Sequence, residues 1–413
     1  MTVEMQTGDT ALARCVACSA QTFAEQHWGR EPLLSRADEL GTDFDDLLSP
    51  GAVDELVSAR GLRTPFLRMA KDGGVLPATS FTRGGGAGAG VGDQVADDKV
   101  LAAIADGATL VLQGLHRAWP PLVQFNARLA QELGHPSQIN AYITPPENQG
   151  FAPHHDVHDV FVLQVSGRKH WTIHRPVVED PLDNQPFGGF KAAIAERVTE
   201  APLIDTVLEP GDALYLPRGT VHAAQALGEI SIHLTVGVHP LTRYGLVRVL
   251  LDAVQDDPEL RASLPMDIDL GDPDALGPHL SATVAALQNA LQRVPPSRVA
   301  ARLAADLMQR TRPEAIGPLA LLAAIESLDQ DTPLRRRGAL RLQLVPADPQ
   351  DERERLKIVL LDRTLELPAD TADAVSAALG GQVFTPADLP GLDTEDQLTL
   401  TRRLLREGIL VPA

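Results

Sequence analysis

The chain has 413 residues, 44% of them apolar and 22% charged, which is the composition of a folded globular protein of two or three domains. Two cysteines are too few for a disulfide framework, and no run of apolar residues is long enough for a transmembrane helix, so we expect a cytoplasmic protein without membrane contact. The net charge of −19 disfavours nucleic-acid phosphates and suits basic partners, although acidity also serves solubility alone.

The N-terminal segment begins without the basic and apolar stretches of a secretory signal, so none is expected. Cys15 and Cys18 form a lone Cys-x-x-Cys, and without a second pair we interpret them as ordinary buried side chains rather than a metal or redox site. Residues 44–48 and 52–57 are predicted to be short helices, with Ser49 as a residue of the capping type.

Residues 84–92 read Gly-Gly-Gly-Ala-Gly-Ala-Gly-Val-Gly and predict a flexible loop. A phosphate-binding loop would need a following Lys-Ser/Thr, which is missing here, so a mobile flap is the preferred interpretation. A strand is predicted over 110–115 and a helix over 120–133, ended by Gly134.

Between Ile139 and Val238 the chain changes to short strands separated by Gly, Pro and Asp turns, which predicts a small β-barrel or sandwich. A tight turn is expected at Ser166–Gly167. The predicted strands are 139–144, 157–165, 168–174 and 230–237, with further strand pattern in 207–220.

After Pro240 the pattern is mostly helical and then mixed. The predicted helices are 244–254, 280–291 and 298–307, the first two separated by a Pro/Gly/Asp-rich stretch at 264–278, followed by 372–379, 386–389 and 395–406; the predicted strands are 340–344, 357–361 and 408–411. The order of the elements after Gly338 suits a winged-helix domain. Acidic residues outnumber basic ones there, so we expect a structural or protein-contact role and no direct DNA binding.

The most informative motif is Pro-His-His-Asp at 153–156. On an extended strand His154 and Asp156 point to the same face, and the distant His222, in Leu-Pro-Arg-Gly-Thr-Val-His, can complete a metal site. Two histidines and one carboxylate on one face of a metal ion are typical of non-heme Fe(II) oxygenases. His155 and His158 are alternatives that could pack or bind substrate without touching metal.

Other metal-binding classes fit this pattern less well. An ordinary cupin supplies His-x-His followed by Glu, and no such Glu is present, while structural zinc sites usually fill four positions, often with Cys. If the oxygenase uses 2-oxoglutarate, a cation must meet its far carboxylate, and Lys169 or its neighbour Arg168 is available; only one of the two can face inward. Asn140 and Tyr142 could bind the cosubstrate or hold a ligand, or could equally be ordinary strand packing.

Three long motifs, at 140–156, 159–171 and 211–222, resemble the JmjC-type cupin oxygenases of the ribosomal oxygenase group, and the resemblance extends over nearly the whole chain. It implies an α+β protein: a double-stranded β-helix (cupin/JmjC) barrel, a helical dimerisation region and a C-terminal winged helix. We therefore expect a JmjC cupin catalytic domain at 1–240, a helical dimerisation domain at 241–315 and a winged-helix domain at 316–413.

The resemblance also implies residue roles and an activity. The family's iron ligands, which are the catalytic residues, fall on His154, Asp156 and His222, its cosubstrate lysine on Lys169, and two pocket positions on Asn140 and Tyr142. The expected protein is a homodimeric hydroxylase that uses Fe(II), 2-oxoglutarate and O2 on an arginine or histidine side chain of a basic ribosomal protein. The alternatives are a hydroxylase of a small molecule or natural-product peptide and a non-catalytic acidic binding scaffold.

Overall fold

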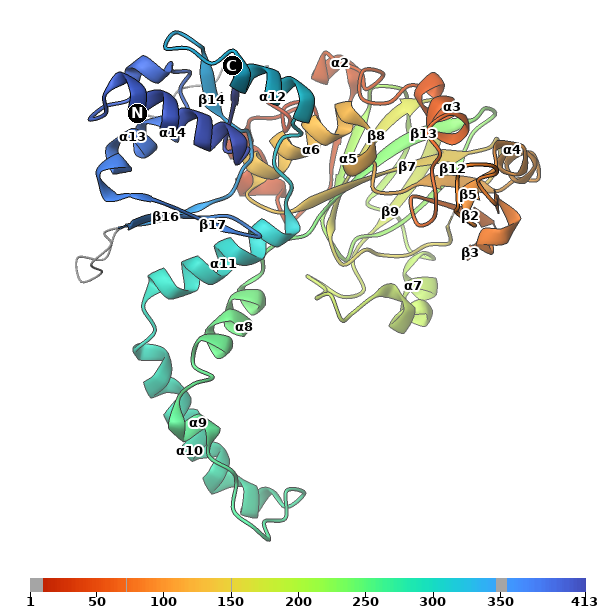
Figure 1. Ribbon diagram of the computed structural model, residues 1–413. Helices are drawn as coiled ribbons and strands as arrows, with labels where there is room; N and C mark the ends of the chain where they lie inside the picture. Colours follow the sequence, from red (N-terminus) through yellow and green to blue (C-terminus); the bar gives the residue numbers. More distant parts are fainter. Residues whose placement is uncertain (1–9, 72, 150, 347–354) are drawn as a thin grey trace. The chain divides into compact units, whose positions relative to one another are not determined.

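The computed structural model describes residues 10–71, 73–149, 151–346 and 355–413. Residues 1–9, on which the expectation of no secretory signal rests, lie outside the described residues. The chain divides into two compact units, Met1–Pro240 and Leu241–Ala413 (Figure 1). Among the described residues no helix has the length and apolar character needed to cross a membrane.

The first unit is built on antiparallel sheets with helices around them. Its strands are β1 (Leu33–Ser35), β2 (Leu67–Lys71), β3 (Gly74–Val75), β4 (Thr82–Arg83), β5 (Gln94–Val95), β6 (Thr109–Leu112), β7 (Ser137–Thr144), β8 (Asp159–Ser166), β9 (Lys169–His174), β10 (Ile204–Leu208), β11 (Ala213–Leu216), β12 (Val221–Ala226) and β13 (Ser231–Val238). Its α-helices are α1 (Ala20–Thr22), α2 (Ala37–Leu40), α3 (Pro50–Ser58), α4 (Asp97–Ala105), α5 (Leu115–Ala118), α6 (Pro120–Leu133) and α7 (Lys191–Arg197), with a π-helix at Phe23–His27 and 3-10 helices at Ala78–Ser80 and Phe187–Gly189.

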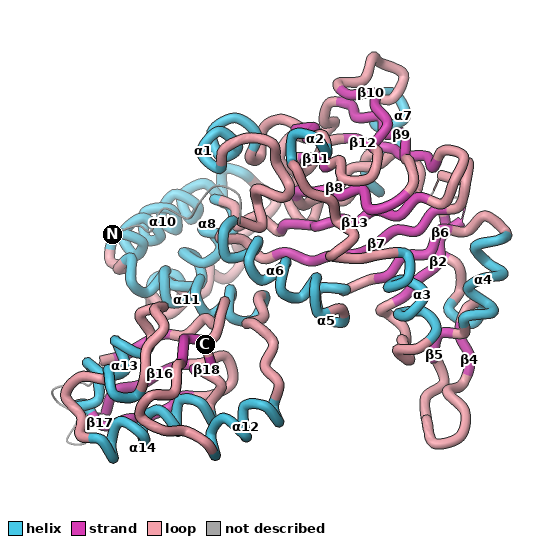
Figure 2. Tube along the Cα trace, turned by 90° about the horizontal axis from the view of Figure 1, so that it is seen from above, coloured by secondary structure: helices cyan, strands magenta, loops and turns pink. Residues whose placement is uncertain are grey.

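Two sheets enclose the centre of this unit. The larger has the strand order β1-β11-β8-β13-β7-β6-β2-β3, and the smaller has the order β10-β9-β12 (Figure 2). The predicted barrel is therefore two separate sheets, which the described strands do not close into one continuous hydrogen-bonded barrel. A short hairpin of β4 and β5 frames the Gly-rich loop 84–92.

Strand β8 explains how the two sheets can share a core. Alternate residues of a strand face opposite sides, and Val160 and Val162 pack with Trp171 of the smaller sheet in one apolar cluster. Phe161 and Leu163 point the other way, into the main core with the N-terminal helices. Because both faces are covered, β8 has no polar side, and its sequence is a nearly continuous apolar run.

Several local predictions need correction. Residues 44–48 form a turn rather than a helix, and the helix begins at Pro50, where the Ser49 side chain accepts a hydrogen bond from the Ala52 N–H at 3.1 Å. The strand predicted at 110–115 ends at Leu112, because the chain turns through Gly114 with a φ of +65°.

In the described part of the second unit, five α-helices come first, and strands with two further α-helices follow. Its α-helices are α8 (Arg243–Ala253), α9 (Pro258–Arg261), α10 (Pro273–Gln292), α11 (Pro296–Arg310), α12 (Pro318–Glu326), α13 (Ala372–Ala378) and α14 (Thr394–Arg406), with 3-10 helices at Ala369–Thr371 and Pro386–Asp388. Its strands are β14 (Leu334–Arg336), β15 (Gln343–Val345), β16 (Arg355–Val359), β17 (Thr364–Pro368) and β18 (Leu410–Pro412). Helix α10 begins inside the stretch predicted to be a linker, because Asp272 caps it and Pro273 occupies its first position.

Candidate metal centre

The segment that carries His154 and Asp156 is a short extension of the smaller sheet. The main-chain N–H of His154 donates to the His222 carbonyl at 3.1 Å, and the His222 N–H donates to the His154 carbonyl at 2.9 Å. The Gly219 N–H donates to the Asp156 carbonyl at 2.9 Å. The pair was predicted to lie on an extended strand; it lies before β8, and His154 forms an isolated bridge with His222 of β12.

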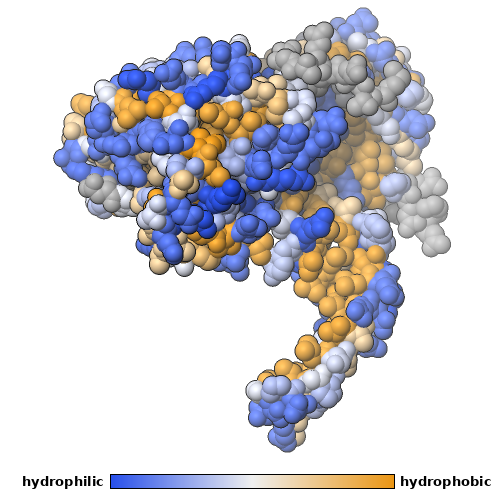
Figure 3. Space-filling view, turned by 180° about the vertical axis from the view of Figure 1, so that it is seen from behind, coloured by the Kyte–Doolittle hydropathy of each residue, from blue (hydrophilic) through white to orange (hydrophobic). Residues whose placement is uncertain are grey.

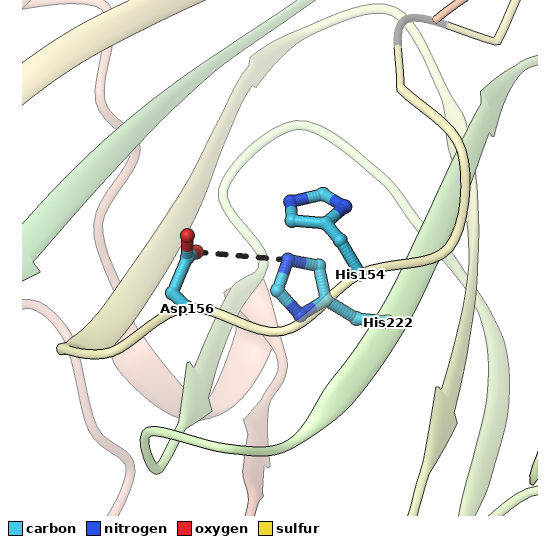
Figure 4. A group of neighbouring side chains, drawn as sticks. All are labelled: His154, Asp156 and His222. Carbon is cyan, nitrogen blue, oxygen red and sulfur yellow. Dashed lines mark ion pairs between the residues drawn. The ribbon is translucent and has the colours of Figure 1, made fainter. Parts of the chain in front are cut away.

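This alignment brings three potential ligands together. One ligand atom from each of His154, Asp156 and His222 lies within 4.8 Å of the other two. The imidazole of His222 points at the Asp156 carboxylate, with 3.8 Å between Nε2 and Oδ2 (Figure 4). His222 is buried, whereas His154 and Asp156 are half-buried and reachable from the pocket.

Hydrogen bonds fix the orientation of both imidazoles. Nδ1–H of His154 donates to the Ala152 carbonyl at 2.8 Å, and Nδ1–H of His222 donates to the Thr220 carbonyl at 3.0 Å. A carbonyl oxygen can only accept, so the lone pair of each ring is on Nε2. Such outer hydrogen bonds orient metal-binding histidines.

The charge states also suit a divalent cation. Burial, with a smaller effect of His154, lowers the pKa of His222 to about 4, so this imidazole is neutral at neutral pH. Burial opposes ionisation of Asp156, but the surrounding histidines outweigh it and lower the pKa of the carboxyl group. Two imidazole nitrogens and one carboxylate are a donor set that fits Fe(II).

The neighbouring histidines lie apart from this cluster. His155 is buried, its Nε2 bonded to the Gln185 carbonyl at 3.2 Å and its ring packed beside Phe190. His158 packs edge-on against His239, with ring centroids 5.1 Å apart. The strand register used for the prediction therefore selects the same histidine as the geometry does.

The cluster opens into a pocket of about 540 Å³, counted with its mouth, and Lys169 lines the same pocket. Lys169 is 3% exposed, and its Nζ donates to Thr144 Oγ1 at 3.1 Å. Burial lowers the pKa of its ammonium to about 7. Arg168 faces outward and pairs with Glu229 at 3.4 Å, so Lys169 is the inward-facing member of the two.

Asn140 and Tyr142 differ in their surroundings. Tyr142 lines the pocket, and its ring stacks on that of His233 at 5.0 Å and 5°. Asn140 is not among the described lining residues, and its Oδ1 accepts the Gly114 N–H at 3.0 Å. This hydrogen bond holds the turn after β6, and a role of Asn140 toward a cosubstrate stays a prediction.

Five polar or aromatic residues among the described lining were not predicted: Thr144, Phe151, Trp171, His233 and Thr235. A signal for two of them was present, since Thr144 lies two residues past Tyr142 and Trp171 two residues past Lys169, on the same strand faces. His233 had no such signal, because it reaches the site through the pairing of β13 with β7, and strands β8 to β12 separate these two in the sequence.

Comparisons with known proteins agree with this geometry. Residues 118–246 match the JmjC domain family. The chain is 30% identical to the bifunctional lysine-specific demethylase and histidyl-hydroxylase NO66 of Culex quinquefasciatus over 60% of this chain and 37% of that protein, and 28% identical to ribosomal oxygenase 1 of Homo sapiens over 70% of this chain and 50% of that protein. It thus spans half or less of the length of these two relatives.

The fold is similar to that of solved ribosomal oxygenases. The structure of YcfD from Escherichia coli in complex with cobalt and succinic acid superposes with a TM-score of 0.55 at 17% identity, covering 96% of this chain and 99% of that one. The complex of YcfD with cobalt and 2-oxoglutarate superposes with a TM-score of 0.52 at 18% identity, covering 96% of this chain and 99% of that one. The resemblance inferred from the three sequence motifs is confirmed.

Proposed function

From the JmjC domain at residues 118–246, we propose that the chain is an Fe(II)- and 2-oxoglutarate-dependent hydroxylase of a side chain in a ribosomal protein. The observation that carries this proposal is the convergence of His154, Asp156 and His222 on a pocket that also contains the buried cation Lys169. A bound iron ion would supply the redox chemistry that inserts one oxygen atom of O2 into a C–H bond while 2-oxoglutarate is converted to succinate and CO2.

The chain's own residues would position the reactants. His154, Asp156 and His222 would hold the metal, and the pocket beside them would admit the other reactants. Lys169 and Thr144 lie in the same pocket and can receive the far carboxylate of the cosubstrate. The apolar cluster of Val160, Val162 and Trp171 excludes water from the remaining wall.

Of the two side chains expected as targets, an imidazole suits the pocket better than a guanidinium. Among the described lining residues, Asp156 is the only carboxylate, and the proposal assigns it to the metal. The guanidinium of Arg68 lies over the ring of Phe151, which lines the pocket, at 5.4 Å, and would repel a second cation. We therefore propose a histidine target.

The other parts of the chain receive proposals that follow the same resemblance. Residues 1–240 would be the catalytic domain, 241–315 a helical dimerisation domain and 316–413 a winged helix, in a cytoplasmic homodimer that acts on a basic protein. Supporting the dimer, helix α8 exposes Tyr244 and Val247 at 55% and 46%. Supporting a separate C-terminal domain, residues of α12–β18 share one apolar core.

The test is succinate formation by the iron-loaded protein with 2-oxoglutarate, with and without basic ribosomal-protein peptides. Asp156→Ala should reduce turnover at least about 100-fold, because it removes one of three ligands. Asp205→Ala, which changes an exposed carboxylate on β10, should leave turnover unchanged. A wild-type protein that binds iron but forms no succinate under any of these conditions would contradict the proposal.

The two alternative functions give different results. A small-molecule hydroxylase would form succinate with metabolites and not with the peptides. A binding scaffold would hold the basic protein equally well after Asp156→Ala and would show no turnover.

A further inference from the structure

Asp159 is a buried carboxylate near the metal cluster to which no role has been assigned. It is the first residue of β8, three positions after Asp156, and it is 1% exposed. Its Oδ1 accepts a hydrogen bond from the main-chain N–H of Arg218 at 2.8 Å. The Tyr215 hydroxyl, which accepts a hydrogen bond from the Gly29 N–H at 2.9 Å, lies beside the same carboxyl group. Packing alone does not account for a carboxylate here, because burying one is unfavourable.

The N–H group of Arg218 belongs to the turn between β11 and β12, which leads to His222. The next N–H group of this turn, that of Gly219, donates to the Asp156 carbonyl at 2.9 Å. Two consecutive N–H groups of the turn are therefore bonded to the segment before β8. One bond goes to the main chain of a ligand residue, and the other goes to the side chain of Asp159.

The loop after β9 also contacts this turn. Gly219 has a φ of +85°, and a Cβ atom there would lie 2.5 Å from the Val178 carbonyl oxygen. The guanidinium of Arg218 pairs with Asp180 at 2.9 Å. These contacts limit where the turn can lie, and the Asp159 carboxylate adds the bond that ties the turn to β8.

The position of the turn determines the separation of two ligands. His222 follows the turn, and its Nε2 lies 3.8 Å from Oδ2 of Asp156. The main chain of His154 pairs with that of His222 at one end of the ligand segment, and the Asp159 side chain binds the turn at the other end. Metal ligands must be held within about 0.5 Å of their working positions, so a turn released at one end should disturb the cluster.

We propose that Asp159 is a positioning residue of the metal centre: through the Arg218 N–H it holds the turn that places His222 beside the other ligands. This inference rests on the proposed function. Because Asp159 acts through the turn and is not itself a ligand, its replacement should change metal affinity and ligand geometry while the three ligand side chains remain present.

The experiment is titration of the metal-free protein with Co(II), followed by visible absorption, which depends on the number and geometry of the ligands. Asp159→Ala removes the acceptor and leaves a buried N–H unpaired. Since loss of a residue that orients metal ligands typically costs about 10- to 100-fold in affinity, this variant should bind Co(II) at least about tenfold more weakly and with an altered spectrum. Asp159→Asn, which keeps an oxygen acceptor at the same distance from the main chain, should restore the spectrum and most of the affinity.

Asp212→Ala is the matched control. Asp212 is also a buried carboxylate that accepts main-chain N–H groups, from Ala37 at 2.9 Å and from Glu209 at 3.0 Å, but it precedes β11 and so lies at the other end of that strand from the turn. This variant should lower the free energy of unfolding while its Co(II) affinity and spectrum stay those of the wild type.

The outcomes separate this inference from the proposed function. Wild-type Co(II) affinity and spectrum in a folded Asp159→Ala variant would overturn the positioning role and leave the metal centre intact. If that variant does not fold, Asp159→Glu replaces it, because the added methylene group displaces the acceptor and keeps the charge. It should bind Co(II) more weakly than Asp159→Asn does, and equal affinities would overturn the inference. A wild-type protein that binds no Co(II) would contradict the proposed function itself.

Discussion

At the scale of single residues, the candidate site depends on burial and on hydrogen bonds to the main chain. His154 and His222 each donate from Nδ1 to a carbonyl two residues earlier, and burial keeps His222 neutral. Burial also lowers the pKa of the Lys169 ammonium to about 7, and its Nζ donates a hydrogen bond to Thr144 Oγ1. These groups are prepared for a cation at one end of the pocket and an anion at the other.

The lowered pKa of Lys169 predicts a pH-dependent affinity for 2-oxoglutarate. Below pH 7 the ammonium is already charged, so affinity should be nearly constant; above pH 7 the empty pocket holds a neutral amine that must gain a proton when the carboxylate binds. Affinity should therefore fall about tenfold per pH unit above 7.

The measurement is titration of the Mn(II)-loaded protein from acidic to alkaline pH, in buffers of different ionisation enthalpy that reveal proton uptake. The affinity for 2-oxovalerate, which has no carboxylate for Lys169, should lack this dependence. Equal slopes for the two oxoacids would show that Lys169 does not bind the far carboxylate.

The sequence could predict the metal cluster because its evidence is local. His154 and Asp156 are separated by one residue. Pro217, Arg218 and Gly219 mark the turn before His222. The place of His233 in the pocket could not be predicted, because it depends on the register between β13 and β7, which spacing along the chain does not encode.

At the scale of elements, turns hold the sheets in register. Gly167, in the turn between β8 and β9, has a φ of +63°, and a Cβ atom there would lie 2.1 Å from the Ile230 carbonyl oxygen. The turn thus places Lys169 at the beginning of β9, where it faces the pocket.

Gly167→Ala should lower the free energy of unfolding by about 2–4 kcal/mol, because it adds both backbone strain and a clash with a fixed carbonyl. Gly134→Ala is the matched control, since Gly134 also has a positive φ, +71°, but has open space around it. That change should cost about 1 kcal/mol. Urea denaturation of both variants checks this, and equal losses would show that the close approach to Ile230 does not matter.

Elements with a strong local pattern were predicted well and those set by tertiary contacts were not. The helix predicted at 120–133 is observed with these bounds, because Pro at its start and Gly134 at its end mark both termini. Helix α10 was predicted too short, because its first turns carry Gly and Pro, which sequence patterns assign to linkers. Strands β14 and β17 were missed, because each is short and depends on its partner strand.

At the scale of the whole molecule, exposed apolar side chains of the second unit bear on assembly. Leu280 and Val284 lie one turn apart on α10, and their side chains are 57% and 45% exposed. Figure 3 shows hydrophobic surface along the helices of the second unit. The proposed homodimer would bury them, which would account for their apolar character.

Changing Leu280 and Val284 together to Glu should therefore give a monomer in light scattering. Asn289→Glu, on the opposite side of the same helix, adds charge without touching the apolar stripe and should leave a dimer. A wild-type protein that is monomeric at all concentrations would contradict the proposed dimer.

The net charge of −19 predicts how a basic substrate should respond to salt. Electrostatic attraction accelerates encounter and is screened as ionic strength rises. The kcat/KM for a basic peptide should fall with added salt while the kcat/KM for 2-oxoglutarate changes little. A peptide kcat/KM that is independent of salt would argue against a role for the acidic surface.

The central claim is that the pocket uses O2 and 2-oxoglutarate to hydroxylate a ribosomal protein. The most direct measurement is intact-mass analysis of ribosomal proteins incubated with the iron-loaded protein, 2-oxoglutarate and isotopically labelled O2. The account predicts that one ribosomal protein gains the mass of one labelled oxygen atom at a histidine, with wild type and not with Asp156→Ala. The absence of any labelled product, with iron bound and 2-oxoglutarate present, would contradict it.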